Sequence, residues 1–175
     1  GLYMALCNHA GNLIISGEYL EAQNALAECE DIMHKHKNIY FPSQYKILND
    51  KILLDYLRGE KEAKSDVKLI RENACKTIEA FKNILDMQKD EVSHVILFNY
   101  LGLLILSDSS DWKNELENAK IKLAKTDAYY QYFLHDLCFS AALLMKDRQT
   151  AQDEIDFLSQ AKVPLLKNYV YIFTE

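Results

Sequence analysis

The apolar residues of this chain recur at helical spacing over almost its whole length. From Glu18 onward they advance by three and four residues and trace one face of a helix; the positions are Ala22, Ala25, Leu26, Cys29, Ile32 and Met33. The same spacing follows from Asp66 and again from Arg148. No strict apolar–polar alternation lasts long enough to indicate a strand. The pattern therefore predicts an all-α protein.

Short polar stretches interrupt this pattern at regular places and predict where the helices end. We expect eight helices in four hairpins, with ranges 2–16, 18–37, 42–58, 62–88, 91–107, 111–125, 127–146 and 148–161, and a ninth helix from Pro164. The turns within the hairpins are expected at 16–18, 58–60, 107–111 and 146–148. Pro42 and Pro164 stand at the start of expected helices, where proline is best tolerated. Asp111 and Asp127 are expected to cap their helices.

The composition agrees with a helical protein of one domain. The 175 residues include only two prolines and five glycines, where average usage would give about 9 and 12. A sheet protein needs many turns and therefore more of both residues. We expect a single domain over residues 1–175. Because the chain opens abruptly inside an apolar pattern, this domain is expected to be part of a longer protein.

The charge and the apolar runs argue against nucleic-acid binding and membrane insertion. The net charge is −6, and no run of basic residues offers a phosphate-binding surface. The longest apolar stretch, 95–106, has 12 residues, whereas a bilayer span takes about 20. The cysteines are expected to be core residues without a C-x-x-C pair, which favours a reducing, cytoplasmic compartment; they are Cys7, Cys29, Cys75 and Cys138.

The chain also repeats itself. The stretch 17–22 aligns with 146–151, and apolar residues follow each stretch at the same intervals. The aligned alanines, Ala22 and Ala151, are 129 residues apart, which corresponds to three steps of 43 residues on average. A small residue at this position allows the two helices of a hairpin to approach closely, whereas larger residues fill the space between hairpins.

This pattern resembles the tetratricopeptide repeat, which has Leu-Gly in its first helix, Gly-Asp/Glu-Tyr at the turn and Ala in the second helix. The matching residues are Gly17, Glu18, Tyr19, Ala22 and Leu26 in the first hairpin, Leu101 and Gly102 in the third, and Asp147, Ala151 and Ile155 in the fourth. The repeats are longer than the family's roughly 34 residues, and Lys64 stands where the second hairpin should have its Ala. The chain thus resembles the divergent, long-helix variety or a neighbouring helical-repeat class. The resemblance implies an α–α superhelix of about four repeats plus a terminal helix.

Catalytic and metal-binding patterns are weak in this sequence. His34 and His36 are two residues apart and point to different sides of a helix, which does not suit one metal ion. Glu91 and His94 have the spacing of a di-iron ligand pair, but a second pair and two further inward glutamates are missing. No phosphate-binding glycine loop or nucleophile elbow is present. We therefore expect no metal, no cofactor and no enzymatic activity.

Polar residues within the apolar first helices indicate a binding groove instead. In the resembled family the first helices line a concave face, and one lining position falls at Cys7, Asn49, Asn99 and Asp136. Neighbouring lining positions carry Asn8, Lys46, Asp50, Tyr56 and Ser140. An Asn amide can donate to and accept from a peptide backbone, so this row could clamp an extended peptide. The alternative is that the asparagines simply face solvent. The eleven tyrosines suit packing between hairpins or contact with a peptide.

The resemblance implies a scaffold that binds a protein or peptide, as the sensor or coupling part of a cytoplasmic regulator. Two alternatives are a homo-oligomerisation module and, less favoured, a helical enzyme with a carboxylate-rich site. The end of the chain bears on the first alternative, because its apolar residues fall on two neighbouring helical stripes: Leu165, Tyr169 and Ile172, then Leu166, Val170 and Phe173. The first stripe can pack on the fourth hairpin. The second, through Val170 and Phe173, is expected to mediate self-association or to contact a further repeat.

Overall fold

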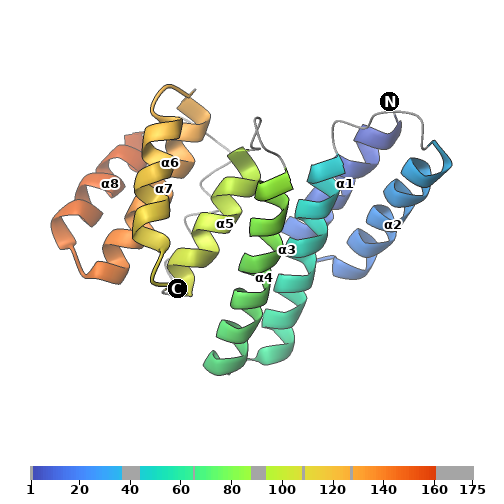
Figure 1. Cartoon of the computed structure of the whole chain (residues 1–175), viewed down its shortest axis with the longest axis horizontal. Helices are drawn as coiled ribbons and strands as arrows, with labels where there is room; N and C mark the ends of the chain where they lie inside the picture. The colour runs from blue at the N-terminus through green and yellow to red at the C-terminus, as the bar shows by residue number, and fades with distance from the viewer. Residues whose placement is uncertain are drawn as a thin grey trace. The chain divides into compact units, whose positions relative to one another are not determined.

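The computed structural model describes residues 2–36, 44–64, 66–87, 94–107, 109–126 and 128–160, and within these ranges the only regular elements are α-helices. They are α1 (Leu2–Ile15), α2 (Tyr19–Lys35), α3 (Gln44–Ala63), α4 (Val67–Met87), α5 (His94–Leu106), α6 (Trp112–Leu123), α7 (Ala128–Met145) and α8 (Arg148–Gln160), as Figure 1 shows. The all-α prediction is confirmed, and each of these helices overlaps one of the first eight expected ranges, although α3 ends later and α4 begins later than expected. The expected N-cap Asp127, together with Pro42, Pro164, Val170 and Phe173, lies outside the described residues.

The chain divides into two compact units, Gly1–Glu91 and Val92–Glu175. In the first unit α1 pairs with α2 and α3 with α4, and α3 also contacts both α1 and α2. In the second unit α5 contacts α6, α7 pairs with α8, and α7 contacts both α5 and α6. Within each unit, the first helix of the later hairpin therefore packs against both helices of the earlier one.

Small residues lie where the helices of a hairpin cross. Ala22 is wholly buried in a cluster with Cys7 and Ala10 of α1, and Ala151 is buried with Phe139 and Ala142 of α7. A larger side chain at either alanine would push the paired helices apart. The prediction that each alanine is buried against the first helix of its own hairpin is confirmed.

The turns of the first and last hairpins share one backbone geometry. Gly17 has φ 78°, and Lys146, 129 positions later, has φ 59°. Glu18 N–H donates to Leu13 O at 2.9 Å, and Asp147 N–H donates to Ala142 O at the same distance. This six-residue closure around a left-handed residue is the Schellman motif that ends many helices. The predicted alignment of 17–22 with 146–151 thus holds at the level of backbone hydrogen bonds.

The turn expected at 58–60 is wrong, because α3 continues through Gly59 to Ala63 and the chain turns at Lys64, which has φ 53°. Gly59 serves a helix contact instead: a Cβ there would lie 2.4 Å from Asn73 Nδ2 of α4. The Asn73 amide donates to the Tyr56 carbonyl at 2.9 Å, one turn earlier in α3. The helix α4 then starts at Val67, and the carboxylate of the preceding Asp66 accepts from two backbone N–H groups of the first turn. Lys64 is therefore a turn residue and not the counterpart of Ala22.

The cysteines are not all in the core. Cys7, Cys29 and Cys138 are buried as expected, but Cys75 is exposed on α4, which corrects the sequence prediction. The Cys7 and Cys29 sulfurs lie 3.7 Å apart between α1 and α2. Burial, and secondarily the hydrogen bond to Cys7, raises the pKa of Cys29 to about 12. This pair therefore packs as neutral thiols.

Two further sequence expectations concern a cap and the membrane. Asp111 is the N-cap residue of α6 as predicted, although its side chain makes no capping hydrogen bond. Among the helices that the structure describes, none has the length and apolar character needed to cross a bilayer.

Candidate functional site

A buried polar cluster lies where the two first helices of the first unit, α1 and α3, meet. Lys46 Nζ donates to Asp50 Oδ2 at 2.6 Å, and Asn49 Nδ2 donates to Asp50 Oδ1 at 2.9 Å. The Asp50 side chain is almost fully buried, while Lys46 keeps 35% of its side-chain surface exposed. A buried carboxylate is tolerated only when it is paired and hydrogen-bonded, and both of its oxygens have a donor here.

Gly11 of α1 allows this cluster to sit against the neighbouring helix. A Cβ at Gly11 would lie 3.2 Å from Lys46 Nζ and 3.6 Å from Asp50 Oδ2. A side chain larger than hydrogen would press on the ion pair. The glycine thus brings the α1 backbone close to the Lys46 ammonium group.

An exposed stripe of α1 runs past Lys46. Met4, Asn8, Gly11 and Ile15 follow one another by four, three and four residues and therefore lie along one side of the helix. Met4, Asn8 and Ile15 are exposed, and two of them are large apolar residues. We call these four residues together with Lys46 the α1–α3 surface. It combines apolar contact area with an amide and a cation.

Asn49 and Tyr56, both expected in the groove lining, are internal residues. Asn49 is only 3% exposed, so the alternative that it faces solvent is wrong, and its amide serves Asp50. Tyr56 is buried, and its hydroxyl donates to Glu60 Oε1 at 2.7 Å. Burial, followed by the hydrogen bond to Glu60, raises the pKa of Tyr56 above its ordinary value. Neither side chain offers the surface that a bound peptide would contact in this conformation.

Asn99 and Asp136, the other expected groove residues, belong to the second unit. Asn99 lies on α5 and Asp136 on α7, and both are partly buried. Burial raises the pKa of Asp136 to about 6. Tyr132, one turn earlier, has its pKa raised by burial and then by the Asp136 charge. A single groove that joins these residues to Asn8 and Lys46 stays a prediction.

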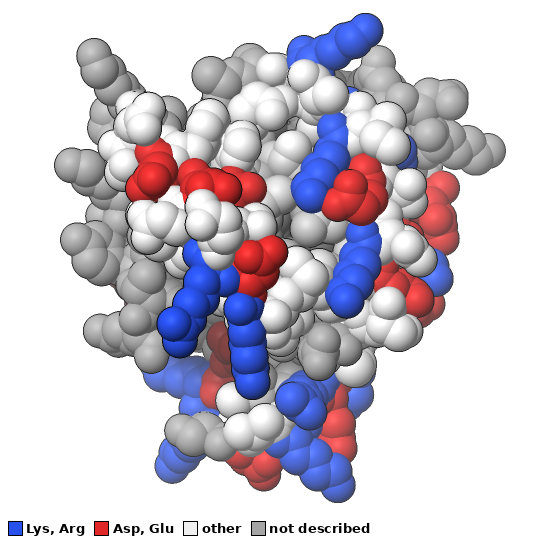
Figure 2. Space-filling view, turned by 90° about the vertical axis from the view of Figure 1, so that its left-hand side faces the viewer, with Lys and Arg blue, Asp and Glu red and all other residues white. Residues whose placement is uncertain are grey.

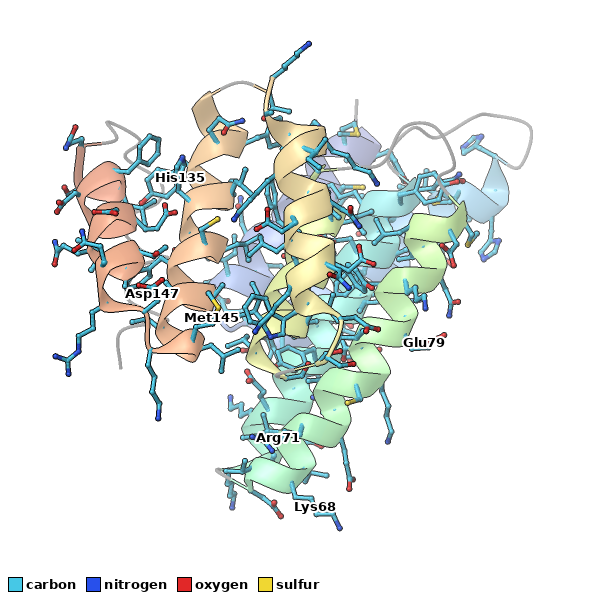
Figure 3. All side chains as sticks on the ribbon, turned by 60° about the vertical axis from the view of Figure 1, so that its left-hand side comes forward. Lys68, Arg71, Glu79, His135, Met145 and Asp147 are labelled. Atoms are coloured by element: carbon cyan, nitrogen blue, oxygen red, sulfur yellow. The ribbon has the colours of Figure 1, made fainter. Side chains whose placement is uncertain are left out.

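Sequence reasoning missed one polar pair, between α7 and α8. His135 Nδ1 and Glu154 Oε2 are 2.5 Å apart, and the His135 ring stacks on Phe157 with centroids separated by 3.6 Å. Figure 3 shows His135 on α7 near the adjacent α8. The sequence alignment at an offset of 129 residues could have predicted this pair. In that alignment His135 and Glu154 correspond to Leu6 and Ala25 of the first hairpin. Two polar residues at facing apolar positions predict a mutual hydrogen bond.

Two hollows lie among charged side chains of the first unit, and the larger, of about 740 Å³, is lined by residues of α4 alone: Val67, Lys68, Arg71, Glu72, Cys75 and Lys76. A hollow of about 250 Å³ lies between α2 and α3, but its two cations already have partners. The Arg58 guanidinium donates to Gln23 Oε1 at 2.9 Å, and Lys61 Nζ lies 5.6 Å from the Tyr19 ring centroid. In Figure 2 acidic and basic side chains are intermixed on the face shown. Within the described ranges, no group of three or more His, Cys, Asp or Glu side chains is arranged to hold a metal.

A scan against protein-family models, a search of the curated proteins and a search of the solved structures each returned no match. The likeness to tetratricopeptide repeats therefore rests on the residues and the hairpin geometry of this chain. It stays a prediction.

Proposed function

We propose that this chain is a scaffold of tetratricopeptide-like hairpins that binds an extended protein or peptide segment, and that the α1–α3 surface is one end of its groove. One observation carries the proposal: the first helices α1 and α3 lie against each other and expose polar and apolar side chains together at their contact. Because α5 and α7 also contact each other, the second unit repeats the arrangement of first helices.

The chemistry of the α1–α3 surface defines the kind of segment that suits it. The Lys46 ammonium has three donors, one of which goes to Asp50. Another can reach a peptide carboxylate or carbonyl, and the Asn8 amide can pair with the peptide backbone. The exposed Met4 and Ile15 can accept apolar side chains on either side. The preferred segment is therefore extended, with an acidic residue flanked by apolar ones.

This role is non-catalytic, and it suits the sensor or coupling part of a cytoplasmic regulator. Homo-oligomerisation through the apolar ends of the chain is the competing role. A test of peptide binding separates the two, because a self-associating module would capture its own segments or none.

The test is selection from a random peptide library, followed by titration of the selected peptide against variants. Asn8→Ala is expected to weaken binding about 5- to 10-fold, which corresponds to one lost hydrogen bond of roughly 1–1.5 kcal/mol. Asn24→Ala, an exposed asparagine on the second helix α2, is the matched control and should bind like the wild type. Lys46 is left intact because its removal would leave the buried Asp50 charge unpaired. Failure to enrich any peptide, or equal loss in both variants, would contradict the proposal.

A further inference from the structure

Two thiols meet between the helices of the first hairpin. The sulfurs of Cys7 on α1 and Cys29 on α2 lie 3.7 Å apart, and both side chains are completely buried. The two helices are joined by the turn at Gly17, whose backbone hydrogen bonds fix the direction in which the chain returns. The hairpin therefore holds the two sulfurs side by side, although the residues are 22 positions apart in the sequence.

A small movement would bring these sulfurs to bonding distance. A disulfide has a sulfur–sulfur bond of about 2.05 Å, so the sulfurs have to approach each other by about 1.7 Å. Rotation about the two Cα–Cβ bonds moves the sulfurs while the backbone stays in place, and a small shift of the helices supplies the rest. Ala10 and Ala22 are wholly buried in the same cluster, and their small side chains keep the two helices close enough for this approach.

We propose that Cys7 and Cys29 are a modification site at which hydrogen peroxide forms a disulfide between α1 and α2. In the first step a thiolate sulfur attacks the peroxide: a sulfur–oxygen bond forms, the oxygen–oxygen bond breaks, and the released hydroxide leaves as water with the proton of that thiol. In the second step the other sulfur attacks the sulfenic acid so formed. The sulfur–sulfur bond forms as the hydroxyl group leaves with the second thiol proton as water. The two sulfurs together lose two electrons, which reduce the peroxide to two water molecules.

The other two cysteines lack such a neighbour. Cys75 is exposed on α4 of the first unit, and Cys138 is buried on α7 of the second. In the part of the chain that the structure describes, no hydrogen bond joins either of them to a second thiol. The last hairpin carries Asp136 and Leu158 at the positions that match Cys7 and Cys29. The first hairpin is therefore the place where oxidation would close a disulfide within one chain.

Burial controls how fast this site reacts. The thiolate is the reactive form of cysteine, and burial raises the pKa of Cys29 to about 12, so this thiol keeps its proton at neutral pH. Peroxide also needs a path to sulfurs that are completely buried, and a local opening of the hairpin provides it. We therefore expect the pair to react more slowly than an exposed thiol, and the disulfide, once buried again, to be reduced slowly.

The disulfide would connect α1 and α2 a second time, in addition to their turn. It closes a loop around the 21 residues between the two cysteines. Such a loop reduces the conformational freedom of the unfolded chain and leaves the folded hairpin in place. Oxidation should therefore stabilise the first unit against unfolding.

The experiment treats the full chain carrying Cys75→Ser with hydrogen peroxide under native conditions. The substitution removes the exposed thiol, which would otherwise form disulfides between molecules. Remaining thiols are blocked with iodoacetamide after unfolding, and the peptides of a non-reducing digest are identified by mass spectrometry. We expect the Cys7 peptide joined to the Cys29 peptide, and separation of the two by dithiothreitol. Iodoacetamide labels on both cysteines, or a link from Cys7 to Cys138, would overturn the proposal.

Thermal unfolding of the same protein before and after oxidation is the second measurement. The unfolding midpoint should rise by about 10 °C on oxidation and return to its first value with dithiothreitol. Cys29→Ala in the same background is the control, because it removes one sulfur and keeps a small apolar side chain at the buried position. Its midpoint should not rise on treatment with peroxide. An unchanged or lower midpoint in the oxidised protein, or an equal rise in the control, would contradict the proposal.

Discussion

The first hairpin, α1 with α2, and the last, α7 with α8, have the same turn but different interiors. Between the paired helices the first hairpin carries two thiols, Cys7 and Cys29. At the matching positions the last carries Asp136, whose pKa burial raises to about 6, and Leu158. The last hairpin also has the close polar contact of His135 with Glu154 where the first has Leu6 and Ala25.

The comparison separates the features that both hairpins share from those in which they differ. The left-handed turn residue, the Schellman hydrogen bonds and the small residue at the crossing recur, because they set the backbone path. The side chains at the other facing positions can be polar, provided that each polar group finds a partner. The two hairpins therefore share the backbone path of the turn and the helix crossing, whereas the side chains between their helices differ in polarity.

The crossing alanines should give the largest contrast. Ala22→Leu is expected to destabilise the protein by about 3 kcal/mol, the upper end of the range for overpacking, because Ala22 is completely enclosed. Ala151→Leu should cost less, about 1 kcal/mol, because Ala151 is 7% exposed and therefore not completely enclosed. Urea unfolding of both variants measures this. A larger loss in Ala151→Leu would contradict the comparison.

The buried carboxyl of the last hairpin should respond to pH in a way that the first hairpin does not. The folded pKa of Asp136 is raised to about 6 from 3.8, so its charge lowers stability above pH 6 and no longer does so below pH 3.8. Asp136→Asn should therefore stabilise the protein at pH 7.5 by about 2 kcal/mol, a value reduced for partial exposure. The gain should shrink as the pH falls from 6 to 4.

Unfolding free energies measured across this pH range test the prediction. Asp153→Asn, at an exposed carboxylate of α8, is the control and should change little at any pH. A pH-independent gain in Asp136→Asn would mean that the stabilisation does not come from removing a buried charge.

The turn residues should give the smallest effects, of opposite sign. Lys146 adopts the left-handed conformation that glycine accepts without strain, so Lys146→Gly should stabilise by about 0.5–1 kcal/mol. Gly17→Lys should destabilise by about 1 kcal/mol for the same reason. Thermal unfolding of the two proteins checks the pair. If both substitutions changed stability in the same direction, the turns would not be equivalent.

Much of the fold follows from local pattern. The apolar spacing located all eight described helices, and the repeat alignment located the equivalent turns at Gly17 and Lys146. The turn predicted at 58–60 was wrong because the residues Arg-Gly-Glu are typical of a turn when only neighbouring residues in the sequence are considered. The true reason for Gly59 is its close approach to Asn73, a contact that only tertiary structure creates.

The candidate site could be predicted only in part. Polar residues within the first helices correctly indicated positions that do not simply pack in an apolar core. Their spacing could not tell that Lys46 and Asn49 would converge on the Asp50 carboxylate, since this depends on side-chain orientation at the helix contact. For the same reason, a polar residue inside an apolar helix can indicate either a binding groove or a buried hydrogen-bond network. Asn49 belongs to such a network, because its amide donates to the Asp50 carboxylate.

The most direct test of the proposed peptide-binding role is amide chemical-shift mapping with a selected peptide. We expect the largest shift changes on α1 and α3, at the residues of the α1–α3 surface: Met4, Asn8, Gly11, Ile15 and Lys46. The amides of α2, including Asn24, should move little. Saturable changes confined to the second helices α2 and α4, with the α1–α3 surface unaffected, would contradict it.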